Sequence, residues 1–490
     1  MTLQQETAAP TPEKARLSPG APRKGGAFQA VLWTLGGEAA TQAFRFLSNL
    51  LLTRLLLPEA FGLMALINVF TYGLNMISDL GIRPIIIRHP RGDDAAFLNT
   101  VWTVRLVRGA VLATAAAALG WPLALFYEDP RLAWLFPAVS LNLLLEGFQT
   151  TKGISRERNL QLGRVTLINL GTSLLGILVM IAWAWKSPTA WALVAGGLAG
   201  TVVRVALTWV ALPGPNNRLQ WDREAWREVS HFGKWVFLSS LVTFLATRFD
   251  KLVFAKLIPF SQLGIYSIAI AMSGLAVEVI LKLSSSVGLP ALSRARERGT
   301  ELAGVFERVR LPLLLAGGAG VSLLILCGPA IISLLYDNRY QSAGWILQIA
   351  AIGAWFQMLE ASHGQLLLAL GKPKWRAIAF TAQIVALLIV FPLAYDSWGF
   401  IGALAAASLI EGVRYAIEAW QVRKAGLTSW GGERLFSGLI LVCGLADVAI
   451  QHGPWFSGTP LLRALLCLAV FAVVWSIAAA WYWRKRRAAA

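Results

Sequence analysis

The chain has 490 residues, of which 56% are hydrophobic and only 14% are charged, and its formal net charge is +18. A soluble protein with this charge would suggest a nucleic-acid ligand, but here Lys and Arg are dispersed among short segments between long apolar stretches. The three cysteines, Cys327, Cys443 and Cys467, lie inside apolar stretches and have neither metal-ligand nor disulfide spacing. Composition therefore argues against nucleic-acid binding, a cysteine metal site and a disulfide framework.

The chain begins with a polar segment rich in Pro and Ala, residues 1–26, which we expect to be a disordered cytoplasmic tail. Fourteen apolar stretches follow, each long enough for a hydrocarbon core of roughly 30 Å, which takes about 20 residues to cross. They cover residues 29–52, 60–80, 97–120, 131–150, 164–185, 189–211, 232–256, 262–285, 309–335, 343–370, 374–394, 398–421, 433–451 and 460–483. The sequence predicts an all-α integral membrane protein with fourteen transmembrane helices.

The gaps between these stretches differ in charge in a way that predicts orientation. Taken alternately, the gaps and termini on one side hold 30 Lys and Arg residues, whereas those on the other side hold six. Short cytoplasmic loops carry the Lys and Arg excess, so both termini are expected in the cytoplasm. The external gaps are short and no Walker-type loop, HExxH motif or catalytic triad is apparent, so an enzyme is not supported.

A weak internal repeat predicts how the helices are organised. The stretch from Arg54 to Leu63 aligns with that from Lys256 to Ile265 at a constant offset, which pairs Gly62 with Gly264. Because an even number of helices separates the copies, helices 1–6 and 7–12 form a parallel repeat around a central cavity, as in transporters that rock two halves about a substrate site. The expected domains are an N-terminal lobe (27–213), a C-terminal lobe (214–425) and two further helices with a basic cytoplasmic tail (426–490).

Several predicted helices carry polar residues at helical spacing, so each presents one polar face. An ionisable group at the bilayer centre costs at least about 2.5–3.5 kcal/mol unless it faces protein or water, so these faces should surround a shared hydrated space. The last two helices are nearly apolar and are expected outside it. The residues expected to line the cavity are Glu38, Gln42, Asn49, Asn75, Asp79, Thr243, Asp250 and Glu360.

Basic residues inside the predicted spans are candidates for binding an anionic headgroup, because a guanidinium fork binds phosphate oxygens in a bidentate manner. The structural alternatives are that these side chains snorkel to the interface or pair with intramembrane carboxylates. The same carboxylates could instead bind a coupling proton or sodium ion. No metal site or organic cofactor is predicted. The candidate headgroup residues are Arg45, Arg105, Arg108, Arg204, Arg248, Lys251 and Arg414.

Three segments together resemble the polysaccharide-transporter family of bacteria, in the O-antigen and exopolysaccharide flippase branch of the multidrug/oligosaccharidyl-lipid/polysaccharide exporter superfamily. The resemblance covers about residues 28–425. Its first segment includes Arg54, Pro58, Phe61, Gly62, Asp79, Leu80, Gly81 and Arg88. The others are the basic segment from Gly153 to Arg158 and the run Arg248, Phe249, Asp250, Lys251 followed by Leu263, Gly264, Ile265 and Tyr266.

This resemblance implies that the protein moves undecaprenyl-pyrophosphate-linked oligosaccharide from the inner to the outer leaflet of the bacterial cytoplasmic (inner) membrane by alternating access. The pyrophosphate would bind the cationic residues and the sugars the polar ones. Membrane lipid, a polysaccharide polymerase and chain-length machinery are the partners to expect, and nucleic acid is not. Two alternatives within the superfamily remain, an ion-coupled drug or small-metabolite antiporter and a lipid-linked peptidoglycan precursor flippase. A scaffold for glycosyltransferases is a third.

Overall fold

The computed structural model describes residues 26–78, 82–427, 430–452 and 460–489. Within these residues every regular element is a helix. The expected tail, apart from residue 26, and the expected cavity residue Asp79 lie outside the described part of the chain.

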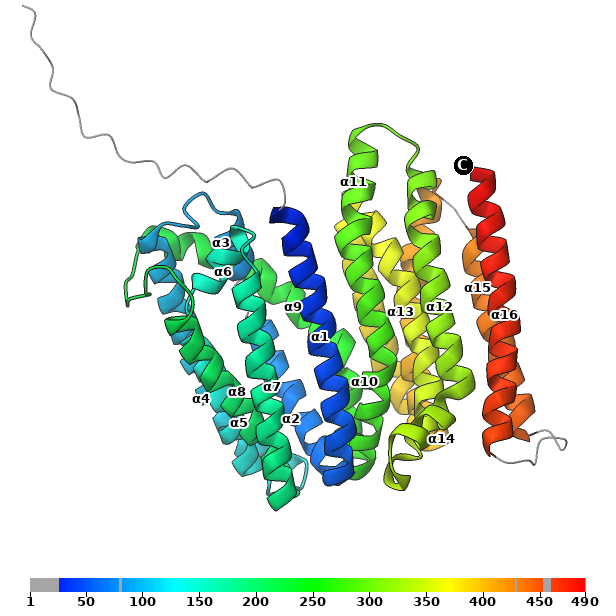
Figure 1. Cartoon of the computed structure of the whole chain (residues 1–490), viewed down its shortest axis with the longest axis horizontal. Coiled ribbons are helices and arrows are strands. Elements are labelled where there is room, and N and C mark those ends of the chain that lie inside the picture. The colour runs from blue at the N-terminus through cyan, green and yellow to red at the C-terminus, as the bar shows by residue number, and fades with distance from the viewer. Residues whose placement is uncertain (1–25, 79–81, 428–429, 453–459, 490) are drawn as a thin grey trace, which may run out of the picture.

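The helices form two groups that follow one another along the chain (Figure 1). The first group contains α1 (Gly26–Leu55), α2 (Pro58–Ile77), α3 (Ile82–Arg88), α4 (Ala95–Phe126), α5 (Leu132–Gly147), α6 (Lys152–Arg158), α7 (Gly163–Lys186) and α8 (Trp191–Val210). The second contains α9 (Arg223–Leu257), α10 (Phe260–Leu283), the π-turn η1 (Ser284–Gly288), α11 (Leu289–Glu297), α12 (Leu302–Leu335), the 3-10 turn η2 (Asn338–Tyr340), α13 (Ala343–Ala369), α14 (Pro373–Lys424), α15 (Trp430–His452) and α16 (Pro460–Ala489).

Local sequence explains where several helices begin and end. Asp94 precedes α4 and its carboxylate accepts a hydrogen bond from the backbone N–H of Ala96, which satisfies one of the free donors of the first turn. Asp222 does the same for α9 through the N–H of Glu224. Pro58 opens α2, where its missing N–H is not needed. These caps lie at positions that turn chemistry alone predicts.

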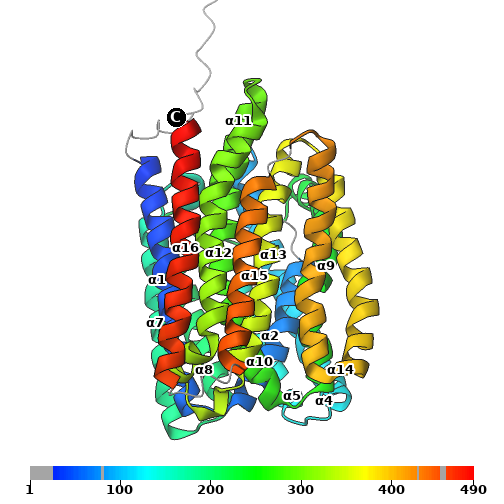
Figure 2. The same ribbon diagram turned by 90° about the vertical axis from the view of Figure 1, so that its right-hand side faces the viewer.

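The longest element, α14, is a helical hairpin. Its backbone leaves helical geometry at Gly399, where φ is 61° and ψ is −148°, a conformation that glycine adopts without steric cost. Beyond that residue the chain runs back along itself, so Arg414 on the second arm lies 3.5 Å from the side-chain oxygen of Gln383 on the first. Figure 2 shows the two arms side by side. The two spans expected at 374–394 and 398–421 correspond to these arms.

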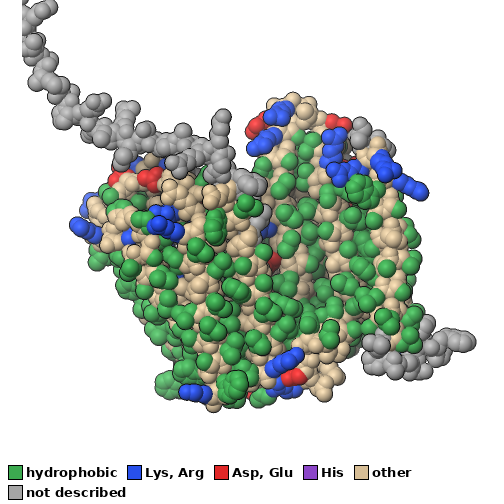
Figure 3. Space-filling model, in the orientation of Figure 1, with side chains coloured by type: hydrophobic (Ala, Val, Ile, Leu, Met, Phe, Trp, Pro, Cys, Tyr) green, Lys and Arg blue, Asp and Glu red, His purple; other side chains and the backbone are tan. Residues whose placement is uncertain are grey.

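The outer surface of the helices is suited to lipid. Of the described helices, eight are long and apolar enough to cross a membrane, or up to nine if the bent pair α5 and α6 forms one span. Apolar side chains cover the flank of the molecule, and Lys and Arg gather mostly at the end near α11 (Figure 3). Large apolar side chains such as Trp185 of α7 and Leu334 of α12 are 80% exposed, as expected for residues that face lipid. This is a multi-pass helical membrane protein.

The two groups of helices meet mainly through α2, which packs against α9 and α10. Within the first group α4 packs on α5 and α7 on α8, and within the second α13 packs on α12, α14 and α10. The helices α15 and α16 pack on α12, outside the rest of the second group (Figure 1). Their position agrees with their low polarity, but α15 also buries Glu433 and Asp447 against the second group, so it is not a purely apolar helix.

Candidate functional site

The polar side chains inside the bundle surround two cavities. The first, which we call the N-terminal cavity, has a volume of about 530 Å³ and is lined by residues of α1, α3, α4, α6, α7 and α8. The second, the C-terminal cavity, has a volume of about 630 Å³ and is lined by α1, α9, α10, α13 and α14. Helix α1 borders both, because Glu38 lines the N-terminal cavity and Gln42, Arg45 and Asn49 line the C-terminal one. Those predicted residues that do line a cavity are therefore divided between two cavities.

The N-terminal cavity holds the guanidinium groups of Arg105 and Arg108 on α4 and Arg204 on α8. Arg105 donates a hydrogen bond of 3.1 Å to the side-chain oxygen of Gln149. The nearest carboxylate oxygen to Arg204, on Glu146, is 3.7 Å away, and the Nε of Arg204 is buried without a hydrogen-bond partner. A buried donor without a partner is unfavourable unless a ligand satisfies it. Arg105 and Arg204 therefore form an arrangement suited to an anion.

Arg108 has a different environment from Arg105, although the two are one turn apart. Its Nε donates to the hydroxyl of Ser78 at 3.0 Å, and its Nη2 donates to the backbone oxygen of Asn75 at 2.7 Å. It also reaches the side-chain oxygen of Asn75 at 3.2 Å, so Asn75 faces Arg108 and lines neither cavity. A cation placed on the last carbonyls of a helix stabilises that end. Arg108 thus caps the C-terminus of α2.

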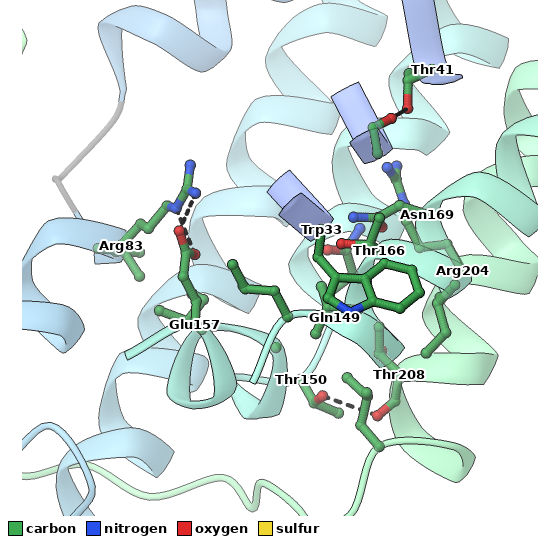
Figure 4. A pocket seen from close by; sticks show the side chains of 18 of the residues that line it. Trp33, Thr41, Arg83, Gln149, Thr150, Glu157, Thr166, Asn169, Arg204 and Thr208 are labelled. Atoms are coloured by element: carbon green, nitrogen blue, oxygen red, sulfur yellow. Dashed lines mark hydrogen bonds and ion pairs between the residues drawn. The ribbon is translucent and has the colours of Figure 1, made fainter. Parts of the chain in front are cut away.

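Other residues of the N-terminal cavity were not among the predicted site residues. Figure 4 shows Trp33, Gln149 and Asn169 around the cavity, with the ion pair of Arg83 and Glu157 at a separate edge. The Arg83 Nε lies 2.8 Å from a carboxylate oxygen of Glu157, which belongs to the short helix α6. Gln149 follows Asn142 and Glu146 at helical spacing, and this polar stripe in the sequence predicted that it would face a hydrated space.

The C-terminal cavity contains a cluster of buried ion pairs. The Arg414 guanidinium lies 3.1 Å from a carboxylate oxygen of Glu411 and 3.4 Å from one of Glu360. Arg376 lies 3.2 Å from the other oxygen of Glu360 and 3.7 Å from Glu418, whose side chain is fully buried. Arg414 and Glu360 are thus partners of each other. At Arg414 the structure therefore shows pairing with intramembrane carboxylates, which was the alternative to headgroup binding.

The other predicted residues of this cavity lie on α1 and α9. Asp250 accepts a hydrogen bond from the hydroxyl of Tyr266. Arg248 lies 5.0 Å from the centre of the Tyr72 ring on α2, within cation–π range. Arg45 and Lys251 line the cavity with it. Thr243 lies outside the lining, and its backbone oxygen accepts a hydrogen bond of 2.8 Å from the hydroxyl of Thr247, which does line the cavity.

Two polar contacts join α1 to α10 between the cavities. Lys282 lies 2.9 Å from a carboxylate oxygen of Glu38, and Gln42 donates to Glu278. Glu278 lies one turn before Lys282 on α10, at a spacing that permits pairing within the helix. The structure pairs Lys282 with a carboxylate of the other helix group instead. Figure 3 shows the molecule hollowed between the two groups, with acidic and basic side chains in the depth of the hollow.

The described residues thus form a multi-pass bundle of helices that encloses two cavities lined by charged side chains. Residues 51–343 match the family model described as "Polysaccharide biosynthesis protein". The match covers more than half of the chain, so the chain belongs to this family. The family resemblance inferred from the sequence is confirmed. The protein is a multi-pass membrane protein of this polysaccharide biosynthesis family.

Two curated proteins resemble this chain at low sequence identity. The chain is 20% identical over 305 residues to the amylovoran biosynthesis protein AmsL of Erwinia amylovora, a match that covers 61% of this chain and 77% of that protein. It is 21% identical over 324 residues to the succinoglycan biosynthesis transport protein ExoT of Rhizobium meliloti (strain 1021), covering 65% of this chain and 64% of that protein.

Solved structures share the fold at lower identity. The lipid II flippase MurJ in an inward closed conformation matches with a TM-score of 0.71 at 14% identity, over 91% of this chain and 99% of that one. An inward-facing multidrug resistance transporter of the MATE family matches with a TM-score of 0.61 at 14% identity, over 78% and 94% of the two chains. At this identity the likeness concerns the fold alone.

Proposed function

We propose that this protein is a flippase that moves undecaprenyl-pyrophosphate-linked oligosaccharide repeat units from the inner to the outer leaflet of the bacterial cytoplasmic membrane, for synthesis of a surface polysaccharide or exopolysaccharide. Membership of the polysaccharide biosynthesis family supports the substrate class. The observation that carries the proposal is the pair of Arg105 and Arg204 in the N-terminal cavity.

These two residues suit a pyrophosphate for physical reasons. Arginine stays charged when partly dehydrated and binds phosphate oxygens through a planar fork. Arg105 has one amide partner, and Arg204 has a buried Nε without a partner, so both have donors left for a ligand. Gln149, Asn169 and Thr166 lie on the same cavity and offer the neutral hydrogen bonds that sugars need.

We further propose that the chain crosses the membrane fourteen times. The long helices α1, α2, α4, α5, α7, α8, α9, α10, α12, α13, α15 and α16, with the two arms of α14, supply that number among the described residues. The start of α1 and the end of α16 lie on the same side of the bundle, which an even number of crossings requires (Figure 1). The Lys and Arg excess supports the cytoplasm as that side. The proposed lobes are residues 27–213 and 214–425, with 426–490 as a peripheral helix pair.

The shape of the molecule supports loading from the cytoplasmic leaflet. The hollow between the two helix groups opens toward the end where α11 lies and where basic side chains gather (Figure 3). At the opposite end the first turns of α2 and α10 are in backbone contact. Alternating access would then open that contact while the hollow closes.

The buried carboxylates Glu360, Glu411 and Glu418 are candidates for binding a coupling proton or sodium ion. A polysaccharide polymerase and chain-length machinery are candidates for partners that act after transport.

The test uses cells in which the gene for this protein is deleted and a variant is expressed in its place. The amount of lipid-linked sugar is then measured separately in the inner and the outer leaflet. Each lost charge-assisted hydrogen bond is worth about 1.5–3 kcal/mol, so Arg105→Ala with Arg204→Ala should lower transport at least about tenfold. Undecaprenyl-pyrophosphate oligosaccharide should accumulate in the inner leaflet. The matched control is Arg164→Ala, because Arg164 is exposed on α7 and does not line the cavity. Normal surface polymer in the double variant would contradict the assignment, and trapped peptidoglycan precursor or drug sensitivity would favour the alternative functions.

A further inference from the structure

A further cavity lies beside helix α6, and we call it the α6 cavity. Its volume is about 200 Å³, and it is bounded by α6, by the first residues of α4 and by the loop at residues 213–217. Gly153, Ile154 and Glu157 of the same helix line the N-terminal cavity. Helix α6 therefore borders two cavities, near the end of the molecule where α1 begins (Figure 1).

One face of α6 presents two basic side chains and a hydroxyl group to the α6 cavity. Lys152, Ser155 and Arg156 line it, and residues three and four apart lie on one face of a helix. Of the described residues that line this cavity, none is acidic. The carboxylate of this helix, on Glu157, lines the N-terminal cavity instead and accepts a hydrogen bond of 2.8 Å from Arg83. The α6 cavity therefore carries positive charge that its own lining does not neutralise.

Several hydrogen-bond donors on this face are left for a ligand. The Nε of Arg156 and the hydroxyl of Ser155 are buried, and neither has a partner among the described residues. The Nη1 of Arg156 reaches the side-chain oxygen of Gln161 only at 3.3 Å. The Lys152 ammonium donates to a backbone carbonyl at 3.1 Å and to the side-chain oxygen of Asn216 at 2.7 Å, which leaves one of its three donors. Buried donors without an acceptor are unfavourable, so the arrangement is suited to an anion.

We propose that the α6 cavity binds a phosphoryl group, carried either by the headgroup of a membrane phospholipid or by a small soluble phosphate. Such a group brings about one to two negative charges and strong acceptor oxygens, which match two cations and the free donors of α6. The volume is below the roughly 300–1,000 Å³ of sites for drug-sized ligands, so the carrier beside the phosphate is short, as glycerol is. The site is separate from the pyrophosphate site proposed at Arg105 and Arg204, and the inference does not depend on that function.

The position of the α6 cavity gives its ligand a way to act on the rest of the molecule. Helix α6 forms one wall, and its other residues border the N-terminal cavity. The loop at 213–217 forms another wall and leads along the chain into α9, the first helix of the second group. A bound phosphoryl group would therefore fix a wall of the N-terminal cavity to the segment that joins the two helix groups.

The test uses the full-length protein in dodecyl maltoside, a detergent without phosphate. Glycerol 3-phosphate is the soluble probe, dioleoyl phosphatidylglycerol is the lipid probe, and dioleoylglycerol is the matched lipid without the phosphate. A ligand that binds the folded state raises the midpoint of thermal unfolding, so the dependence of the midpoint on probe concentration gives the dissociation constant. We expect at least one phosphate probe to raise the midpoint, and the probe that does so identifies the source.

Variants of α6 locate the binding. Ser155→Ala with Arg156→Gln removes the hydroxyl and the charge, so it should weaken binding of that probe at least about tenfold. Lys152 is left unchanged because its two hydrogen bonds hold neighbouring backbone and loop in place. Arg156→Gln alone is measured as well, in case the double variant does not fold. Arg218→Gln is the control, since Arg218 is exposed close to the same loop and lies outside the lining.

Three results would overturn this site: a midpoint that neither phosphate probe changes, an equal rise with dioleoylglycerol, and equal binding by the wild-type and Arg156→Gln proteins. Arg105→Ala with Arg204→Ala should bind the probe as the wild-type protein does, because those residues line the N-terminal cavity. Loss of binding in that variant would instead assign the phosphate to the N-terminal cavity and refute the α6 site. Leaflet-resolved transport is measured separately, so this inference and the flippase function can each fail alone.

Discussion

Gly62 of α2 and Gly264 of α10 pack backbone against backbone, and the contact is symmetric. A Cβ atom on Gly62 would overlap the carbonyl oxygen of Phe260, and one on Gly264 would overlap that of Pro58. In both cases the overlapped carbonyl lies four residues before the partner glycine. Close approach of helix backbones through small residues is a common way to pack helices in membranes. The same two glycines are paired by the internal sequence repeat, as expected if this contact lies at the axis that would relate the two copies.

Replacing either glycine should loosen this end of the molecule. Gly62→Ala or Gly264→Ala forces the backbones apart, and overpacking of this kind costs about 1–3 kcal/mol. We expect a lower midpoint of thermal unfolding in detergent for both variants. Gly438→Ala on α15 is the control, since nothing lies within 4 Å of the added methyl group. An unchanged midpoint in Gly62→Ala would show that the helices can separate without cost.

Two cations hold the helix groups together at the same end. Lys256 of α9 lies 2.7 Å from both the Phe126 carbonyl and the Glu128 carboxylate beyond α4, and Arg339 lies 3.0 Å from the Thr53 carbonyl at the end of α1. Removing both cations by Lys256→Ala and Arg339→Ala should therefore favour opening of this end. With spin labels on residues 186 and 397, the double variant should show a larger population with a long distance between the two labels than the wild-type protein. Lys256→Arg should restore the wild-type distribution, and identical distributions in all variants would count against these contacts as a closure.

The contact between Lys256 and the Glu128 carboxylate should depend on pH. The hydrogen bond from Lys256 lowers the pKa of the Glu128 carboxyl below its ordinary value of 4.5. A lowered pKa in the folded state means that the contact stabilises this closure above about pH 4.5 and is lost as pH falls through the lowered pKa. The spin-label distances should therefore be constant from pH 8 to about pH 5 and lengthen only below that range. Glu128→Gln should remove the change, and a transition near neutral pH would contradict this origin.

A buried ion pair secures the peripheral helices. Glu433 of α15 contacts Arg310 of α12, and Tyr415 donates to Glu433 at 3.1 Å, while both members of the ion pair are at most 4% exposed. Glu433→Ala leaves a buried charge without its partner, which costs about 3–5 kcal/mol. A large fall in thermal stability is expected. Glu307→Ala breaks the more exposed pair with Lys485 and should cost less than about 1 kcal/mol. Equal effects of the two changes would refute the difference in burial as the cause.

Arg105 and Arg108 should respond differently to the same change. Arg108→Ala leaves the last carbonyls of α2 without their donor, so the expected loss is about 1–3 kcal/mol of stability. Arg105→Ala should leave the protein folded and lower transport instead. Size-exclusion profiles and unfolding midpoints, measured beside transport, distinguish the two. Comparable stability in both variants would mean that Arg108 is not a structural cap.

The sequence alone was enough to predict an all-helical multi-pass membrane protein, because each long apolar helix meets the bilayer through its own side chains, but it did not predict the short helices α3, α6 and α11. An apolar run of the right length forms a helix wherever it lies, and a break was expected at residues 395–397, between two such runs, whereas the backbone leaves helical geometry at Gly399. The family could also be inferred, because its motifs are local and ordered along the chain.

Which side chains meet was decided by the tertiary structure. Arg105 and Arg108 are three residues apart, so helical spacing puts them on a common face. Only packing brings Ser78 and Asn75 to Arg108 and brings Gln149 to Arg105. Likewise α1 carries one continuous polar stripe, and only the position of its neighbours divides that stripe between two cavities. The pairing of Glu433 with Arg310 joins helices far apart in the chain, and a charge at either position looks the same in sequence whether or not it has a partner. Hydropathy is a property of single residues and short runs, whereas pairing depends on contacts between segments, so only the fold can settle it.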